Sequence, residues 1–342
     1  MEEKNQPVGV IGAGSFGMAI ANLLAENHDV LMYARRKEVI DAIESRTGRY
    51  KVLAPKIQAE NSLEVIAKRC ALIFPIVPSQ AFRPMMRNLG PHLKPYHLLI
   101  HGTKGLDLSL APEGQPLRPE YIKTMSQVIE EESVVCRVGC LSGPNLSKEI
   151  MEGQPAATLI ASPYREVIKA GQKALKSSMF QVYGTHDIIG TELAGALKNI
   201  IALAAGLLSG KGMGKNVWAL LVTRGLSEMI HLGKAVGADV KAFLGVAGIG
   251  DLIATASSSN SRNYKTGYRF AQGETLDQIL ESTTDVVEGL RTLETVKALT
   301  SHMKLSLPIM EMLHRIFFKD MDMDKAIYFL MNYPYAVDVD FL

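Results

Sequence analysis

The segment Val8–Gly17, with the sequence VGVIGAGSFG, decides the fold of this chain. An apolar run ends in three glycines at the spacing G-x-G-x-x-G, and an alanine-rich stretch follows. In a strand-turn-helix unit, Gly12 permits the tight turn, Gly14 lets the backbone approach a pyrophosphate, and Gly17 lets the helix pack closely on its strand. Free N–H groups at the start of the helix then bind phosphate oxygens. The segment therefore predicts a dinucleotide site, since it has the flanking strand and helix that the motif requires.

Short β-rich runs alternate with amphipathic helical patterns from this segment to about residue 188. The expected strands are Val8–Ile11, Val30–Tyr33, Ala71–Val77, His97–His101, Val134–Val138, Thr158–Ala161 and Gln181–Tyr183. The helical patterns are Met18–Glu26, Val39–Ser45, Leu63–Arg69, Tyr121–Glu131 and Tyr164–Leu175. This alternation predicts a parallel sheet covered by helices on both faces. Prolines in Leu108–Glu120 predict a surface loop that lengthens one strand-to-helix connection.

The strand signal ends near Asp187, and the rest of the chain reads as helices. These are expected at Thr191–Leu208, Asn216–Val236, Val240–Phe243, Asn263–Gln272, Gly289–His302 and Pro308–Phe318. We therefore predict an α/β protein: a Rossmann-type doubly wound sheet over residues 1–188, the dinucleotide-binding domain, and an all-α domain over residues 189–342 for substrate binding and catalysis. A length of 342 residues is enough for two cores. The tail Asn332–Leu342 is expected to be an irregular strap.

The composition is that of a globular protein, with 47% hydrophobic and 21% charged residues. A net charge of +2 without a basic block argues against a nucleic-acid partner. The acidic start is unlike a secretory signal, and the apolar run Ile200–Leu208 is shorter than the roughly 20 residues that span a bilayer. We expect a cytoplasmic protein whose three cysteines, Cys70, Cys136 and Cys140, are reduced core residues. The eight histidines lack ligand spacing, so no metal site is expected.

The stretch Thr191–Gly210, TELAGALKNIIALAAGLLSG, places Lys198 inside a helix that otherwise reads as buried. Its helical neighbours cannot pair with an ammonium; they are Ala194, Gly195, Ile201 and Ala202. Burial of this kind lowers the pKa of a lysine by as much as roughly 3–5 units. The lysine would then suit proton transfer near neutral pH. The alternative is that the aliphatic part of the Lys198 side chain lies on apolar surface while its ammonium group reaches water.

Two arginines, Arg35 and Arg36, follow the second expected strand. An NAD-selective site usually has Asp or Glu here to bind the ribose 2′-hydroxyl. The guanidinium group of arginine instead offers parallel N–H donors that can bind a 2′-phosphate. The pair therefore predicts that NADP(H) is preferred and NAD(H) possible, unless it is merely a solvated basic pair that opens a helix.

Several later loops carry candidate substrate-binding residues. Lys104, in HGTKG at 101–105, follows the fourth expected strand at the sheet edge where such folds bind ligands, and it suits an anion. Gly143 lies in a loop after the next strand. Asp251 lies in a glycine-rich apolar segment, where it caps a helix or pairs with a buried group. Each position also has an interpretation without a ligand: Lys104 as an exposed loop lysine, Gly143 as part of a turn, and Asp251 as a helix cap.

A second anion site is indicated at residues 258–263, with the sequence SSNSRN. Ser261 can cap the following helix, while free N–H groups and the Arg262 fork would bind a phosphate. A capped helix with a solvated arginine is the alternative.

Taken in order, these motifs resemble the NAD(P)-dependent glycerol-3-phosphate dehydrogenases, from Val8 to about Leu313. The matching stretches are GAGSFG at 12–17, HGTKGL at 101–106, SGPN at 142–145, ELAGALKN at 192–199, GIGDL at 248–252, NSRN at 260–263 and VEG at 287–289. The resemblance implies reversible reduction of dihydroxyacetone phosphate to sn-glycerol 3-phosphate for glycerophospholipid synthesis. It also suggests a homodimer.

The resemblance also implies residue roles. Lys198 matches the family's proton acceptor and donor, and with Asp251 and Lys104 it forms the expected catalytic set. The positions that match substrate contacts are Lys104, Gly143, Asn145, Lys198, Asp251, Ser261, Arg262 and Asn263. Those that match cofactor contacts are Gly12, Gly14, Ser15, Phe16, Gly17, Arg35, Arg36, Lys104, Ser147, Arg262, Val286 and Glu288. Asn145 stands where bacterial members usually have Ser or Thr, and Ser147 replaces a common alanine.

The resulting hypothesis places a phosphorylated small molecule between the two domains, with its phosphate at Arg262 and its reacting oxygen at Lys198. Asp251 would orient the lysine or that oxygen, and Lys104 would add positive potential. Two alternatives remain: a related dehydrogenase for another hydroxy acid or an acyl thioester, and a noncatalytic NADP-binding redox sensor. The downstream Ser-Arg-Asn site disfavours the first, and the Lys198 and Asp251 pair disfavours the second.

Overall fold

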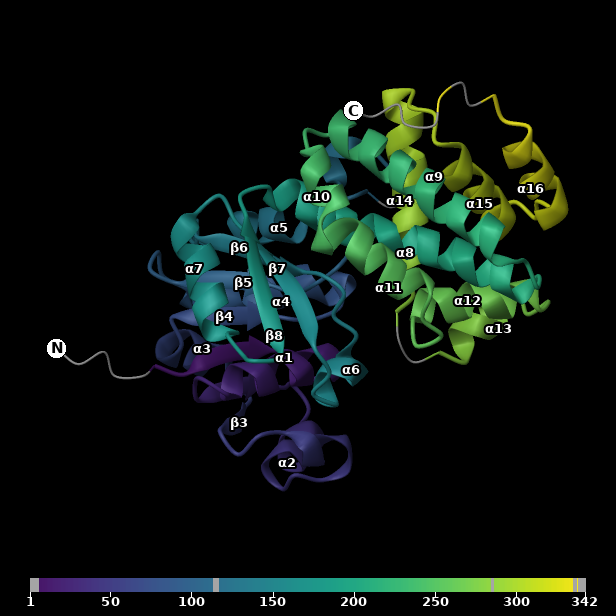
Figure 1. Cartoon of the computed structure of the whole chain (residues 1–342). Helices are drawn as coiled ribbons and strands as arrows, with labels where there is room; N and C mark the ends of the chain where they lie inside the picture. Colours follow the sequence, from purple (N-terminus) through teal and green to yellow (C-terminus); the bar gives the residue numbers. More distant parts are fainter. Residues whose placement is uncertain (1–5, 113–116, 284–285, 335–336, 338–342) are drawn as a thin grey trace. The chain divides into compact units, whose positions relative to one another are not determined.

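The computed structural model describes residues 6–112, 117–283, 286–334 and 337 (Figure 1). It divides into two compact units. The first consists of Met1–Asp107 and Lys123–Ile188, and the second of Leu108–Ile122 and Ile189–Leu342. The predicted division at residue 188 differs from this one in residues 108–122, which leave the first unit and cluster with the second.

The first unit is built on an eight-stranded sheet in the order β3-β2-β1-β4-β5-β6-β7-β8. The strands are β1 (Val8–Ile11), β2 (Val30–Tyr33), β3 (Ile57–Glu60), β4 (Leu72–Pro75), β5 (Leu98–His101), β6 (Val138–Ser142), β7 (Ala156–Ala161) and β8 (Phe180–Thr185). Neighbours pair in parallel except β6 and β7. The order steps outward from β1 in both directions, to β2 on one side and β4 on the other. This switch point is where doubly wound folds bind ligands.

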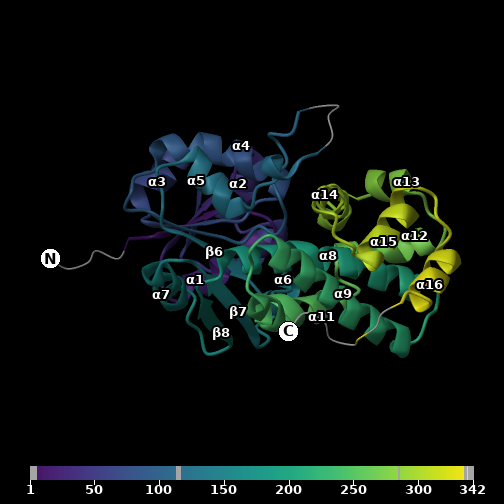
Figure 2. The ribbon, with the colours of Figure 1, turned by 90° about the horizontal axis from the view of Figure 1, so that it is seen from above.

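Helices cover both faces of the sheet (Figure 2). One core cluster takes its buried residues from the sheet and from α1 (Ser15–Ala25), α2 (Lys37–Glu44), α6 (Ser147–Met151) and α7 (Arg165–Ala174). The other also takes them from the sheet, together with α3 (Leu63–Arg69), α4 (Ser79–Leu89) and α5 (Met125–Glu132). The short 3₁₀ turns are η1 (Gly48–Val52), η2 (Gly90–His92) and η3 (Pro119–Tyr121). The predicted Rossmann-type α/β class is confirmed.

The second unit is helical. Its elements are α8 (Ile188–Gly210), α9 (Lys215–Ala235), α10 (Val240–Leu244), the π-helical turn η4 (Val246–Gly250), α11 (Asp251–Ala256), α12 (Arg262–Ala271), α13 (Leu276–Glu281), α14 (Glu288–Met303), α15 (Pro308–Phe318) and α16 (Met323–Met331). Helices α8 and α12 pack backbone against backbone through glycines. A Cβ on Gly206 would lie 2.0 Å from the Tyr264 carbonyl oxygen, and one on Gly267 would lie 2.0 Å from that of Leu203. Larger residues at these two positions would push the helices apart.

Helix α8 is the central element of this unit. It is longer than the predicted apolar run, and by length and composition it could cross a bilayer. However, 89% of its most apolar window is buried inside the structure, as in the core helix of a globular protein. Its apolar character therefore matches its packing.

Several predicted elements need correction. The strand expected at Val134–Val138 lies at 138–142 instead, and Val134 is exposed. Cys136 is exposed rather than in the core, whereas Cys70 and Cys140 are buried. Strand β3 and the helices α4, α6, α11, α13 and α16 were not predicted from the pattern. Most of the predicted C-terminal strap lies outside the described residues.

Candidate functional site

The glycine-rich turn between β1 and α1 has the geometry of a phosphate cradle. Gly12 has φ of +123°, and a Cβ there would lie 2.0 Å from the Ile76 carbonyl oxygen. A Cβ on Gly17 would lie 1.9 Å from the carbonyl oxygen of Gly12. At Gly14, by contrast, a Cβ would meet no atom within 4 Å, so that backbone faces open space. Two glycines therefore shape the turn and one leaves its surface open, which fits a dinucleotide.

The residues next to this turn lie where a nucleotide could reach them. Ser15 is exposed at the start of α1, and Phe16 is half-buried. The Phe16 ring approaches Gly102, where a Cβ would lie 3.0 Å from Cε1. The pair Arg35 and Arg36 is exposed at the end of β2, which pairs with β1.

A further cation, Arg49, lies beside the same turn and was missed in the sequence. Its Nη2 donates to the Ala13 carbonyl oxygen at 3.0 Å and to the Tyr50 hydroxyl at 2.8 Å. The Tyr50 hydroxyl also donates to Ala13, at 3.3 Å. This guanidinium adds positive charge next to the cradle. No local motif marks it, since only the fold brings η1 to residue 13.

A second group in the first unit joins the ends of β5 and β6. Lys104 Nζ donates to the Gly143 carbonyl oxygen at 3.0 Å. Gly143 has φ of +156°, which residues with a side chain rarely adopt, and a Cβ there would lie 3.0 Å from the Ala157 carbonyl oxygen. Asn145 Nδ2 donates to the Thr158 hydroxyl at 2.8 Å, while its buried Oδ1 has no partner among the described residues. A buried acceptor without a donor is costly, so Asn145 is suited to a ligand N–H or O–H. Ser147 follows at the start of α6.

In the second unit, α8 and α11 bring three side chains together. Lys198 Nζ donates to Asp251 Oδ1 at 2.7 Å and to the Thr255 hydroxyl at 2.5 Å. The Thr255 hydroxyl donates to the same carboxylate oxygen at 3.2 Å. Lys198 is 6% and Asp251 2% exposed. This is a buried ion pair with a bridging hydroxyl.

The pair changes the picture of a lone buried lysine. Its helical neighbours cannot pair with it, as expected, but Asp251 approaches from another helix. The carboxylate favours the ammonium and so opposes the effect of burial. A buried ammonium that is held in one position is a proton donor with a defined geometry. Thr255, also missed in the sequence, lies four residues after Asp251 and hence on the same helical face.

Close packing fixes Asp251. It is the first residue of α11, directly after the π-helical turn. A Cβ on Gly248 would lie 2.1 Å from the Phe243 carbonyl oxygen, so this turn requires a residue without a side chain. The glycines of the segment thus let the turn pack closely enough to position the acid.

Next to the lysine, Asn199 begins a chain of hydrogen bonds across three helices. Its Oδ1 accepts from Asn263 Nδ2 at 2.9 Å, and Asn263 Oδ1 accepts from the Gly289 amide at 2.9 Å. The two functional groups of Asn263 are therefore engaged within the protein. Its side chain thus positions α12 against α8 and α14, and its contact with substrate stays a prediction.

The predicted phosphate-binding residues lie at the start of α12. Ser261 caps this helix by accepting from the Tyr264 amide at 3.3 Å, and Arg262 is exposed. Val286 and Glu288 lie before and at the start of α14, each half-buried. Among the described residues, no group of three or more His, Cys, Asp and Glu side chains could hold a metal ion.

One buried carboxylate lies outside the predicted set. Glu228, on α9, accepts from the backbone amides of Ile309 and Met310 at 2.6 and 3.0 Å. Burial raises the pKa of this carboxyl to about 8, while the two amides lower it. The side chain thereby anchors the start of α15 to α9.

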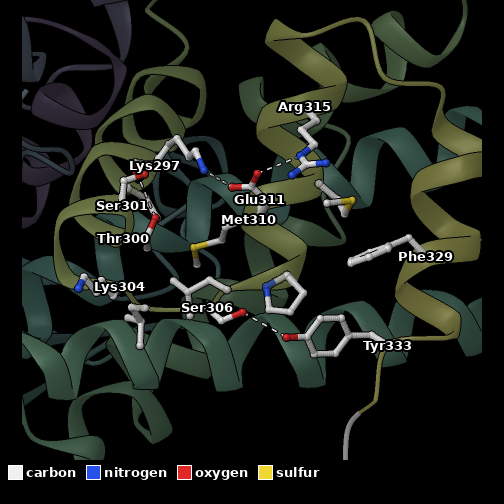
Figure 3. Close-up of a pocket in the computed structure, with 15 residues that line it drawn as sticks. Lys297, Thr300, Ser301, Lys304, Ser306, Met310, Glu311, Arg315, Phe329 and Tyr333 are labelled. Atoms are coloured by element: carbon white, nitrogen blue, oxygen red, sulfur yellow. Dashed lines mark hydrogen bonds and ion pairs between the residues drawn. The ribbon is translucent and has the colours of Figure 1, made fainter. Parts of the chain in front are cut away.

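The helical unit also contains a polar pocket of about 370 Å³ between α14, α15 and α16 (Figure 3). Two of its three cations, Lys297 and Arg315, pair with Glu311, and Ser306 hydrogen-bonds Tyr333 across it. Its lining residues do not include the lysine or aspartate of the buried pair.

Comparison with known proteins covers nearly the whole chain. The models for the N-terminus and C-terminus of NAD-dependent glycerol-3-phosphate dehydrogenase match residues 7–168 and 187–328. A glycerol-3-phosphate dehydrogenase [NAD(P)+] of Pseudomonas savastanoi is 38% identical, over 98% of this chain and 97% of its own.

Two solved structures extend this likeness. The crystal structure of glycerol-3-phosphate dehydrogenase from Coxiella burnetii has a TM-score of 0.85 at 29% identity, covering 96% of this chain and 99% of its own. The glycerol-3-phosphate dehydrogenase of Plasmodium falciparum, at 22% identity, has the same fold, with a TM-score of 0.86 and 97% of each chain covered.

Proposed function

Because the chain belongs to the NAD-dependent glycerol-3-phosphate dehydrogenase family, we propose that it reversibly reduces dihydroxyacetone phosphate to sn-glycerol 3-phosphate with NAD(P)H. The observation that carries this proposal is the buried pair of Lys198 and Asp251, joined at 2.7 Å. An acid-base group of this kind is what reduction of a ketone requires, because the developing alkoxide must receive a proton.

In the proposed reaction, Lys198 donates a proton to the substrate oxygen and is reprotonated afterwards. Asp251 and Thr255 hold Nζ by two hydrogen bonds. The amine is therefore already in position, and no conformational freedom has to be lost when it reacts. When bound, the nicotinamide cofactor supplies or accepts the hydride. In the reverse direction the same amine takes the hydroxyl proton.

The first unit would hold the cofactor. The open backbone at Gly14 and the start of α1 suit the pyrophosphate. The exposed guanidinium groups of Arg35 and Arg36 suit a 2′-phosphate and support a preference for NADP(H). Lys104 and the open acceptor of Asn145 would contact cofactor or substrate.

The substrate phosphate would bind at the start of α12. Arg262 is exposed there and carries a charged fork, and the first-turn amides of the helix add partial positive charge. Glu288 and Val286 are proposed cofactor contacts. A homodimer, a cytoplasmic location and a role in glycerophospholipid synthesis complete the proposal.

The test follows NADPH absorbance in the presence of dihydroxyacetone phosphate. We expect oxidation of one NADPH per ketone reduced, slower turnover with NADH, and little turnover with unphosphorylated dihydroxyacetone. The Arg262→Ala variant should chiefly raise KM for dihydroxyacetone phosphate, by about tenfold or more for a lost charge-assisted contact. No oxidation with either cofactor would overturn the proposal, and unphosphorylated dihydroxyacetone reacting equally well would overturn the phosphate site.

A further inference from the structure

Arg49, in the 3₁₀ turn η1, is held against the glycine-rich turn although it belongs to no motif. Its Nη2 donates to the Ala13 carbonyl oxygen at 3.0 Å and to the Tyr50 hydroxyl at 2.8 Å. The guanidinium carbon also lies 4.9 Å from the centre of the Tyr50 ring. Tyr50 is itself buried in the core cluster that contains α1 and α2. The arginine is therefore in a fixed position although its side chain is exposed.

The residues after Arg49 tie η1 to the helix that starts at the glycine-rich turn. Asn22, on α1, accepts from the Ala54 amide at 2.9 Å and donates to the Val52 carbonyl oxygen at 3.1 Å. Contacts on both sides of Arg49 thus join η1 to the turn and to α1.

These contacts leave the charge of Arg49 uncompensated. The carbonyl of Ala13 and the hydroxyl of Tyr50 are both uncharged acceptors, and Arg49 forms no ion pair with a described residue. Both printed hydrogen bonds come from Nη2, so the N–H groups on Nε and Nη1 have no partner among the described residues. A guanidinium with open donors and an exposed side chain is suited to an anion.

The sheet brings two further arginines close to this place. Strands β1 and β2 pair in parallel with Ile11 opposite Tyr33, so Ala13 and Arg35 follow the two strands at the same edge of the sheet. Helix α2 begins after Arg36, and η1 packs against α2. In nucleotide-binding folds of this type the pyrophosphate lies at the start of the first helix, and the ribose 2′ position faces the end of the second strand.

We propose that Arg49 binds the 2′-phosphate of NADP(H), together with Arg35 and Arg36, and is a specificity-determining residue for the cofactor. The proposal rests on the proposed dehydrogenase function and adds to it a residue from a separate segment of the chain. The bonds to Ala13 and Tyr50 hold the guanidinium in place before the ligand arrives, so little side-chain freedom is lost on binding. NAD(H) has a hydroxyl at this position and would leave the charge without a partner.

Calorimetric titration of the full-length protein with adenosine 2′,5′-bisphosphate and with adenosine 5′-monophosphate tests the proposal. The two probes differ only in the 2′-phosphate. Arg49→Ala should weaken binding of the bisphosphate about tenfold, as expected for a lost charge-assisted contact, and change binding of the monophosphate little. An equal loss for both probes would overturn the proposal, because it would mean that Arg49 only shapes the glycine-rich turn.

A second variant separates the charge of Arg49 from its bond to Ala13. Glutamine is neutral but can still donate to a carbonyl oxygen. Arg49→Gln should therefore lose bisphosphate affinity as Arg49→Ala does, again with little change for the monophosphate. Bisphosphate binding by Arg49→Gln that equals that of the unaltered chain would contradict a role for the charge.

The matched control is Lys51→Ala. Lys51 is an exposed cation of the same 3₁₀ turn, and in a helix with about three residues per turn it lies on a different side from Arg49. This variant should bind both probes like the unaltered chain. Equal weakening of bisphosphate binding in Lys51→Ala and Arg49→Ala would indicate a general electrostatic effect and overturn direct contact.

The unaltered chain separates failure of this proposal from failure of the proposed function. It should bind the bisphosphate more tightly than the monophosphate. If it does and Arg49→Ala keeps the same preference, only the role of Arg49 is wrong. If the unaltered chain binds the two probes equally, the proposed 2′-phosphate site is wrong as well, including the roles of Arg35 and Arg36.

Discussion

The glycine-rich turn of the first unit and the lysine-aspartate pair of the second are built on opposite principles. At the turn, the backbone forms the binding surface. Gly12 and Gly17 let the turn pack tightly, and Gly14 leaves its backbone open to a ligand. At the pair, capacity comes from side chains on two helices, α8 and α11, whose partners lie 53 residues apart in sequence. The first is local, and the second exists only after the helices have packed.

This difference determines how each region should respond to mutation. A backbone cradle is damaged by adding atoms, because an added Cβ occupies the ligand's space. A buried side-chain pair is damaged by removing atoms, because the remaining partner is left as an unpaired charge.

Replacing Lys198 by alanine should lower kcat about 10³-fold, the contribution of a positioned general acid, with little change in KM. The measurement is steady-state turnover with dihydroxyacetone phosphate and NADPH. The variant should also unfold more easily, by about 3–5 kcal/mol, because Asp251 stays buried without its partner.

The double variant Lys198→Ala with Asp251→Asn separates these effects, since it should regain stability without regaining turnover. Lys241→Ala, an exposed lysine on α10, is the control and should behave normally. A normal kcat in Lys198→Ala would contradict the role of the buried pair.

Gly14→Ala should weaken cofactor binding about 100-fold while leaving stability nearly unchanged. The φ of −77° at this residue suits alanine, and its Cβ would meet no protein atom within 4 Å. Gly12→Ala should instead destabilise the fold, because its Cβ would collide with the Ile76 carbonyl oxygen. Fluorescence titration with NADPH, together with thermal unfolding, compares the two. Unchanged NADPH affinity in a folded Gly14→Ala protein would rule out the cradle.

Replacing Arg35 and Arg36 together by alanine should raise KM for NADPH about tenfold and leave KM for NADH nearly constant. These arginines act through their side chains in a region where the backbone otherwise forms the binding surface. The measurement is the ratio of kcat/KM for the two cofactors. An equal change for both cofactors would indicate a general role rather than binding of a 2′-phosphate.

Glu228→Gln should change the pH dependence of stability rather than catalysis. The folded-state pKa of about 8 lies above the ordinary value of 4.5, so this carboxyl contributes stability at low pH that is lost as pH rises through 8. Urea unfolding measures the free energy of unfolding between pH 5 and 8. This free energy should fall less with rising pH in the variant than in the unaltered chain, with a difference of a few kcal/mol at most. Parallel curves would mean that the two backbone amides keep Glu228 ionised throughout.

The fold was largely predictable, because strong periodicity marks most of its elements. The exceptions have physical causes. Strand β3, IQAE, is a short edge strand with polar residues, and α4 contains Pro84 within a helix. Strand β6 was placed too early because the β-branched pair Val134–Val135 precedes it, whereas pairing with Leu99 begins the strand at Val138.

The site was predictable to different degrees in the two units. The glycine motif is contiguous, so its position follows from a few residues. The sequence marks Lys198 as a charge in an apolar helix, but its neighbours along the helix do not identify its partner, and Asp251 was expected beside it only from the family resemblance. Thr255 gave only the weak signal of its spacing from Asp251, and Arg49 gave none. Recognition of such residues depends on tertiary packing.

The path of residues 108–122 has a consequence for dissecting the protein. The polypeptide passes from one unit to the other after Asp107, after Ile122 and again after Ile188. Within residues 108–122, η3 packs against α14. A single proteolytic nick after Ile188 would leave two covalent connections intact. A gene truncated at that codon would encode a fragment in which η3 lacks α14, the helix against which it packs. The halves of this enzyme are therefore interlaced by the chain itself rather than joined in tandem.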